Sequence, residues 1–233
     1  LTTLGFGTGN YNDALMEQLA DVGNGNYAYI DGLNEARKVL VEELSSTIMT
    51  IANDVKIQIE FNPDLVKEYR LLGYENRALK REDFNNDKVD AGDIGAGHSV
   101  TALYELVLQG NHSSRIDPLR YQDTTINKGS SHHTKLNELA FIKFRYKALN
   151  ASKSQLISRP IVKPEHINQF KDASGDFRFS ATVAEFGEVL RDSKYLAEVD
   201  YNTMIKHALA AKGEDPFGYR SEFIQLLRLA SSL

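Results

Sequence analysis

The sequence predicts an α/β segment over residues 1–47, an antiparallel β-sandwich over 48–163 and a helical segment over 164–233. Three observations favour this division. Strand and helix patterns alternate in the first segment, whereas apolar residues recur at every second position in the middle of the chain. From about residue 164 onward, apolar residues return to the spacing of three and four that is typical of helices.

The first segment reads as strand, helix, strand, helix. Residues 1–7 form a strand that ends in "GFGTGN", and residues 12–22 form a helix that Asn10 or Asn12 can cap. "YAYID" is a short strand, and "GLNEARKVLVEELSSTI" is one amphipathic helix. This order is half of a doubly wound sheet. The apolar sides of the two helices are expected to be Ala14, Leu15, Leu19 and Val22, and Ala36, Val39, Leu40 and Leu44.

The middle segment contains two strands, "DVKIQIEF" and "LAFIKFRYKAL", in which apolar and polar residues alternate. Such strands have one buried face and one solvated face. "VKEYRLLGYE" and "HSVTALYELVLQ" are further strands, and residues 109–135 are a polar loop. Pro160 cannot donate to a strand ladder, so "SQLISRPIV" is interpreted as an edge strand or its exit. We expect Ile57, Ile59, Ile142 and Phe144 to face a shared core, and Lys56, Lys143, Arg145 and Lys147 to face solvent.

The last segment contains three predicted helices. "DYNTMIKHALAAKG" and "GYRSEFIQLLRLASSL" are two of them, with Asp200 and Gly218 as start signals and Gly213 as a stop. In the other helix, "DFRFSATVAEFGEVLRDS", the apolar face is predicted to carry Phe179, Val183, Phe186 and Leu190.

Composition excludes several classes of protein. The 233 residues include no cysteine, which excludes disulfides and thiolate metal sites, and the net charge of -5 argues against a nucleic-acid surface. No apolar run approaches the roughly 18 residues that span a bilayer. The chain begins with Leu1 in the middle of a predicted strand, so we expect it to be a fragment.

The turn "GFGTGN" raises the question of a nucleotide site. A dinucleotide-binding turn needs G-x-G-x-x-G, but Asn10 or Asn12 occupies the last position, depending on where the count begins. The Gly-Lys-Ser/Thr of a phosphate-binding loop is also absent. We therefore interpret Gly5, Gly7 and Gly9 as residues of a tight strand-to-helix turn.

Long motifs resemble one bacterial family. "LTTLGFGTGNYNDALMEQLADVGNGNYAYID" resembles the last strand-helix-strand part of a von Willebrand factor type A (VWA) domain. "DVKIQIEFNP", "YRLLGYENRAL", "EDFNNDKVDAGDIGAGHSVTALYE" and "GYRSEFIQLL" resemble the C-terminal domain of unknown function in bacterial VWA proteins of the YfbK type. The resemblance covers nearly the whole chain and is weakest over 109–135.

The resemblance implies a doubly wound sheet with a metal-ion-dependent adhesion site. Its Asp-x-Ser-x-Ser motif is absent here, so no catalytic, cofactor-binding or metal residue is assigned, and Mg²⁺ is expected only in the missing N-terminal part of the VWA domain. The resemblance further implies a non-enzymatic binding or assembly protein of the periplasm or cell envelope. Protein partners are expected, among them the missing N-terminal half or a second copy of the chain.

Other residue groups are candidate sites. Asp83, Asn85 and Asp87 match the first EF-hand spacings, but Lys88 and Ile94 replace the glycine and the bidentate glutamate, which favours an acidic turn. The adjacent His132 and His133 are interpreted as part of a solvated loop, and Glu185 and Glu188 as a solvated helix face. The Lys143, Arg145 and Lys147 row could instead meet an acidic partner.

Two alternative functions remain open. A hydrolase-type enzyme could use the neighbourhood of Glu75 and His98, provided that a pocket brings the two together. Glu75 and Arg77 could equally form an ion pair that holds a turn, and His98 could be a structural histidine. The third possibility is a purely structural support for the VWA domain.

Overall fold

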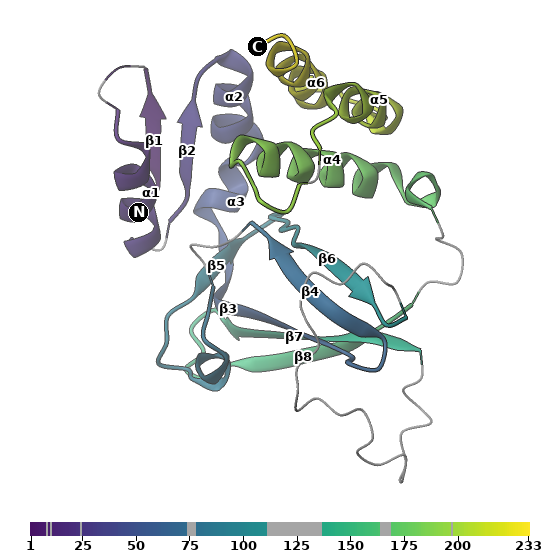
Figure 1. Cartoon of the computed structure of the whole chain (residues 1–233). Coiled ribbons are helices and arrows are strands. Elements are labelled where there is room, and N and C mark those ends of the chain that lie inside the picture. Colours follow the sequence, from purple (N-terminus) through teal and green to yellow (C-terminus); the bar gives the residue numbers. More distant parts are fainter. Residues whose placement is uncertain are drawn as a thin grey trace. The chain divides into compact units, whose positions relative to one another are not determined.

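The structure is a computed structural model that describes residues 1–7, 9, 11–23, 25–73, 78–110, 137–163, 169–196 and 198–233. It is a mixed α/β protein with antiparallel sheets (Figure 1). Its contacts divide the chain into two units. One unit comprises Leu1–Tyr29 and Glu42–Lys163, and the other comprises Ile30–Val41 and Pro164–Leu233.

The chain begins with the predicted strand-helix-strand order. Strands β1 (Thr3–Phe6) and β2 (Tyr27–Ile30) form a two-stranded sheet, joined by α1 (Asp13–Val22). The arrows of the two strands point in the same direction (Figure 1), as the helical crossover requires. Of the two predicted caps, the Asn12 side chain accepts a hydrogen bond from the Leu15 amide at 3.1 Å; Asn10 lies outside the described residues.

The predicted single helix after β2 is divided into three pieces. It consists of α2 (Leu33–Arg37), a π-helical turn (Lys38–Glu42) and α3 (Leu44–Ile48). Wider turns of this kind insert one extra residue, so the apolar stripe predicted for a regular helix does not keep its direction. None of the residues in α2 or the π-helical turn is buried. The prediction of one continuous amphipathic helix was therefore wrong.

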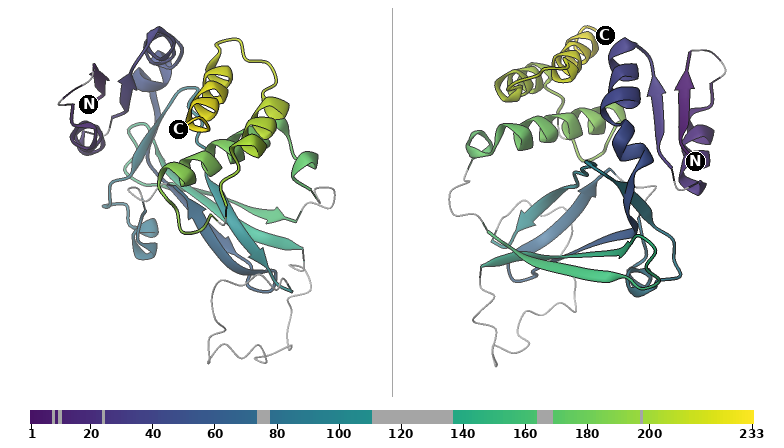
Figure 2. Two further views of the ribbon diagram at one scale, coloured as in Figure 1. Left: turned by 45° about the horizontal axis from the view of Figure 1, so that its top comes forward. Right: turned by 180° about the vertical axis from the view of Figure 1, so that it is seen from behind.

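The middle of the chain forms two antiparallel sheets. Strands β5 (Gly92–Gly95), β3 (Thr50–Phe61), β7 (Glu138–Ala148) and β8 (Gln155–Val162) form a four-stranded sheet in that order, and β8 lies at its edge as predicted. Strands β4 (Val66–Leu72) and β6 (Leu103–Leu108) form a two-stranded sheet. Figure 2 shows β3, β7 and β8 side by side from two directions. The greater part of the predicted 109–135 loop lies outside the described residues.

The register of the four-stranded sheet confirms which residues share a face. Ile57 pairs with Phe144 and Ile59 pairs with Ile142, so all four side chains lie on the same side. At the end of this face, the Phe61 ring lies 4.6 Å from that of Tyr69 in β4 and 5.2 Å from that of Tyr104 in β6.

The two faces of the sheet are not buried as predicted. Ile57 is 50% exposed, whereas Lys56, expected in solvent, is only 4% exposed. Lys56 is buried because the segment that connects β4 to β5 supplies backbone carbonyl groups to the charged face.

The C-terminal residues form the predicted helices α4 (Gly175–Leu190), α5 (Tyr201–Ala211) and α6 (Tyr219–Ala230), preceded by a short 3-10 turn (Phe170–Asp172). Asp200 caps α5 by accepting from the Thr203 amide, and Gly218 precedes α6 with φ 82°. Val183 and Leu190 are exposed rather than buried, because α5 and α6 cover a narrower stripe of α4 than predicted. The buried core consists of Phe186, Met204, Ala208, Ile224 and Leu227.

Candidate functional site

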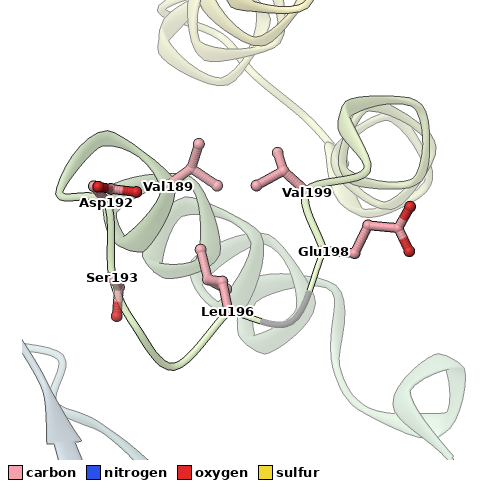
Figure 3. Close-up of a pocket in the computed structure, with 6 residues that line it drawn as sticks. All are labelled: Val189, Asp192, Ser193, Leu196, Glu198 and Val199. Atoms are coloured by element: carbon pink, nitrogen blue, oxygen red, sulfur yellow. The ribbon is translucent and has the colours of Figure 1, made fainter.

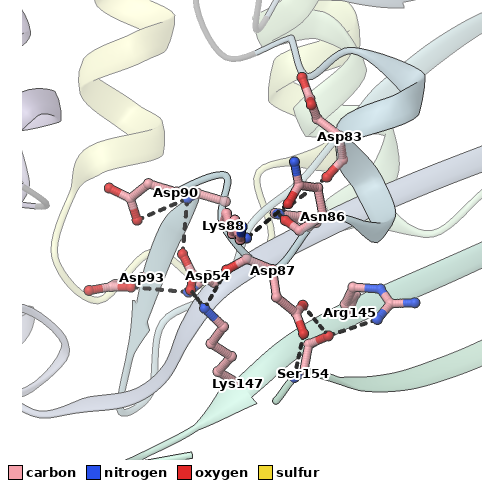
Figure 4. Close-up of polar contacts among 12 residues, drawn as sticks. Asp54, Asp83, Asn86, Asp87, Lys88, Asp90, Asp93, Arg145, Lys147 and Ser154 are labelled. Carbon is pink, nitrogen blue, oxygen red and sulfur yellow. Dashed lines mark hydrogen bonds and ion pairs between the residues drawn. The ribbon is translucent and has the colours of Figure 1, made fainter. Parts of the chain in front are cut away.

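The densest polar network of the described residues lies where the segment 81–93 contacts β3 and β7 (Figure 4). We call residues 81–93 the acidic strap; it begins with a 3-10 turn (Arg81–Asn85). The Lys56 ammonium donates to the backbone carbonyls of Asp83 at 3.3 Å and Asn86 at 2.6 Å. A buried ammonium needs such acceptors, because an unpaired charge in the interior is costly. Lys56 therefore anchors the strap to β3.

A bulge in β3 builds the second contact. The register of β3 and β7 shifts between Asn53 and Lys56, and Asp54 adopts φ 50° there. This geometry lets the Asp54 carboxylate pair with the Lys147 ammonium and accept from the Ala91 amide at 3.2 Å. Lys147 also donates to the Asp87 carbonyl at 2.9 Å. Lys147 thus holds the middle of the strap, as Lys56 holds its beginning.

Ser154 links the strap to β7. Its hydroxyl donates to the Asp87 carboxylate at 2.6 Å and accepts from the Arg145 guanidinium at 2.7 Å. Arg145 also donates to the Asn85 side chain at 2.9 Å and lies 5.5 Å from the Phe84 ring. Figure 4 shows Asp87, Ser154 and Arg145 converging at one end of the network.

The electrostatics of the strap favour the charged forms. The hydrogen bonds from Ser154 lower the pKa of Asp87. For Asp54, burial acts to raise the pKa, but the hydrogen bonds from Lys147 and from the Ala91 amide outweigh it and the pKa is lowered. The bond to Asp54 in turn raises the pKa of Lys147. The contacts of the strap therefore favour the charged forms of Asp54, Asp87 and Lys147.

This arrangement corrects the solvated-face interpretation of β7. Arg145 and Lys147 do not face open solvent, because the chain's own acidic strap is their partner. Carbonyls of Asp83 and Asp87 bind lysines, and within the described ranges no group of three or more His, Asp or Glu side chains could hold a metal ion.

Tyrosines fill the glycine-rich turn. A Cβ on Gly5 would lie 1.9 Å from the Tyr11 hydroxyl, so glycine is required for the ring of Tyr11 to pack there. The Tyr11 hydroxyl donates to that of Tyr27 at 3.1 Å, and Tyr27 in turn donates to Asp13. The Tyr29 hydroxyl donates to the Gly7 carbonyl at 2.5 Å. These contacts support the interpretation of a packed structural turn.

Several of the other candidate residues cannot be placed in the described part of the chain. Glu75, Arg77, His132 and His133 lie outside the described residues. His98 is exposed after β5. Glu188 is buried and accepts from the Ser193 hydroxyl at 2.8 Å, so the prediction of a solvated face was wrong for it. Burial raises the pKa of Glu185, since α5 covers its side of α4.

A shallow pocket lies at the end of α4 (Figure 3). It has a volume of about 180 Å³ and an apolar floor of Val189, Leu196 and Val199. Asp192, Ser193 and Glu198 complete its lining, and Figure 3 shows the Glu198 carboxylate directed away from the floor.

No helix in the described part of the chain has the length and hydropathy to cross a membrane.

Sequence reasoning did not identify the residues that hold the strap. Lys56 lies at a regular polar position of an alternating strand, and Ser154 belongs to an ordinary turn sequence. Two charge patterns were the available signal: basic residues at every second position of β7, and a loop rich in carboxylates elsewhere in the chain. These opposite charges could have predicted that the loop pairs with β7, but not which residues hold it there.

Comparison with known proteins identifies the family. The family described as "Uncharacterized protein YfbK, C-terminal" matches residues 46–233. "Uncharacterized protein YfbK" of Escherichia coli (strain K12) is 50% identical over 234 residues, covering 100% of this chain. The chain spans 39% of the length of that relative. No solved structure matches. The chain therefore belongs to the family of YfbK C-terminal domains.

Proposed function

We propose that the chain is a non-enzymatic binding and assembly module, the C-terminal portion of a VWA protein that makes protein–protein contacts in the bacterial envelope. The observation that carries the proposal is an exposed apolar stripe on α1. Leu15, Leu19 and Val22 recur at helical spacing and are 49%, 45% and 80% exposed. Exposed apolar stripes of this kind are typical of interaction surfaces.

The small sheet beside this stripe supports the same proposal. Strands β1 and β2 pair only with each other in the described residues. An isolated pair of strands is marginal in water, and further strands or helices are needed to stabilise it. The proposed partner is the N-terminal part of the VWA domain, in which any Mg²⁺ site would lie; a second copy of the chain is the other candidate.

In the same proposal, residues 48–163 form a β-sandwich that supports the α/β portion. The contacts of Phe61 with Tyr69 and Tyr104 favour it, because they join one face of the four-stranded sheet to β4 and β6. The strap is then a structural part of the sandwich rather than a ligand site.

The test compares Leu19→Glu with Leu226→Glu, since Leu19 and Leu226 are exposed to 45% and 51% on different helices. Mass in solution and amide exchange over 1–47 are measured for residues 1–233. We expect self-association or fast exchange in the parent chain, and a loss of self-association in Leu19→Glu alone. A monomer whose first 47 residues exchange as slowly as β3 and β7 would contradict the proposal.

A further inference from the structure

The N-terminus of α6 presents a stacked aromatic pair to α2. The rings of Phe217 and Tyr219 lie 5.8 Å apart with an interplanar angle of 28°. The Arg37 guanidinium lies 5.7 Å from the Phe217 ring, and the Lys38 ammonium lies 5.6 Å from the Tyr219 ring. Two consecutive cations, the last residue of α2 and the first of the π-helical turn, thus meet two aromatic rings, which is favourable because aromatic faces attract cations.

Rigid capping fixes the position of this aromatic pair. The Asp215 carboxylate accepts from the amides of Arg220 at 3.2 Å and Ser221 at 2.8 Å. The Arg220 side chain returns to the end of α5 by donating to the Lys212 carbonyl at 3.0 Å. The rings are therefore held on a preorganised corner, so little side-chain order has to be gained when they bind the cations.

The backbone of α2 changes at the same point. The π-helical turn starts at Lys38, directly after the last residue of α2. Such turns change the direction of the side chains on either side of them and are frequent at functional positions. By its contacts, the segment Ile30–Val41 groups with the C-terminal helices, although it lies between β2 and α3 in the chain.

We propose that Arg37, Lys38, Phe217 and Tyr219 form a two-point latch through which the C-terminal helices hold α2. The partner recognised by the aromatic pair is a run of two basic residues, supplied here by the chain itself. Phe217 is 41% exposed, so the latch is a surface contact that can open without unfolding the core around Leu227. This inference does not depend on the proposed binding role of α1.

The chain contains no tryptophan, so Phe217→Trp introduces a single fluorophore and retains an aromatic ring in the latch. In this background, Arg37 and Lys38 are both replaced by glutamine. The charge-matched control replaces Lys206 and Arg228, two exposed residues of α5 and α6, by glutamine. Acrylamide quenching should rise about twofold in the latch variant and stay unchanged in the control, because an unlatched ring faces solvent.

Equal quenching constants for the latch variant and its control would overturn the proposal. If the double variant loses helical ellipticity, the quenching result cannot be interpreted, and amide exchange in Phe217→Leu is the test of the latch. Leucine keeps an apolar side chain at this position but removes the aromatic ring. Exchange over 33–41 should then be about fivefold faster than in the parent chain. Unchanged exchange over 33–41 would also overturn the latch.

Discussion

Leu227 and Leu226 provide a matched test of the helical core. They are neighbours in α6, but Leu227 is 0% exposed and packs with Phe186, Met204 and Ile224, whereas Leu226 is 51% exposed. Leu227→Ala removes three buried carbon groups, worth about 2.4 kcal/mol at about 0.8 kcal/mol each. A residual cavity raises the expected cost to about 2.5–5 kcal/mol. Leu226→Ala should cost below about 1 kcal/mol.

The assay is urea denaturation followed by helical ellipticity. Both substitutions make the same change in helix propensity, so the difference between the two variants reports burial alone. We expect the Leu227→Ala midpoint to fall well below that of Leu226→Ala, with similar slopes. Equal midpoints would refute the assigned facing of α6 and with it the core that positions the latch.

Two further predictions concern single polar groups. Arg220→Ala should destabilise the helices by about 1–3 kcal/mol, because Arg220 donates to carbonyls at the end of α5 and lies 5.0 Å from the Phe179 ring. Arg228→Ala is the control. Equal urea midpoints for the two variants would contradict the stabilising role of Arg220. The Ser154 hydrogen bonds lower the pKa of Asp87 in the folded state, so its stabilisation is present above the unfolded pKa of about 3.9 and is lost as the pH falls through the folded value. Asp87→Asn should therefore reduce the acid sensitivity of the urea midpoint below about pH 4, whereas substitution of the exposed Asp64 by Asn should not.

The strands, and the side chains that share a face of them, were largely predictable because their pattern has a strict period. Alternation in "DVKIQIEF" fixes which side chains share a face, but not the register that pairs Ile57 with Phe144, because a shift of two residues keeps the same faces. What alternation cannot predict is which face is covered. The strap covers the charged face through carbonyl groups, which carry no sequence signal.

The helices illustrate a second limit. The start signals Asp200 and Gly218 were correct because caps act within one turn. The π-helical turn at Lys38 was missed, since nothing in a heptad pattern distinguishes it from a regular turn. The aromatic latch was also missed, because Arg37 and Phe217 are remote in sequence and cation–π pairs have no fixed spacing.

The strap has a consequence for the order of folding. Its bonds join residues that are far apart in the chain, from 27 positions for Lys56 with Asp83 to 67 for Ser154 with Asp87. The hairpin of β7 and β8 closes a much shorter loop, so its entropy of closure is lower and it should form earlier. The strap would then dock after the rate-limiting step, and substitutions at Asp87 should speed unfolding while they leave the folding rate nearly unchanged.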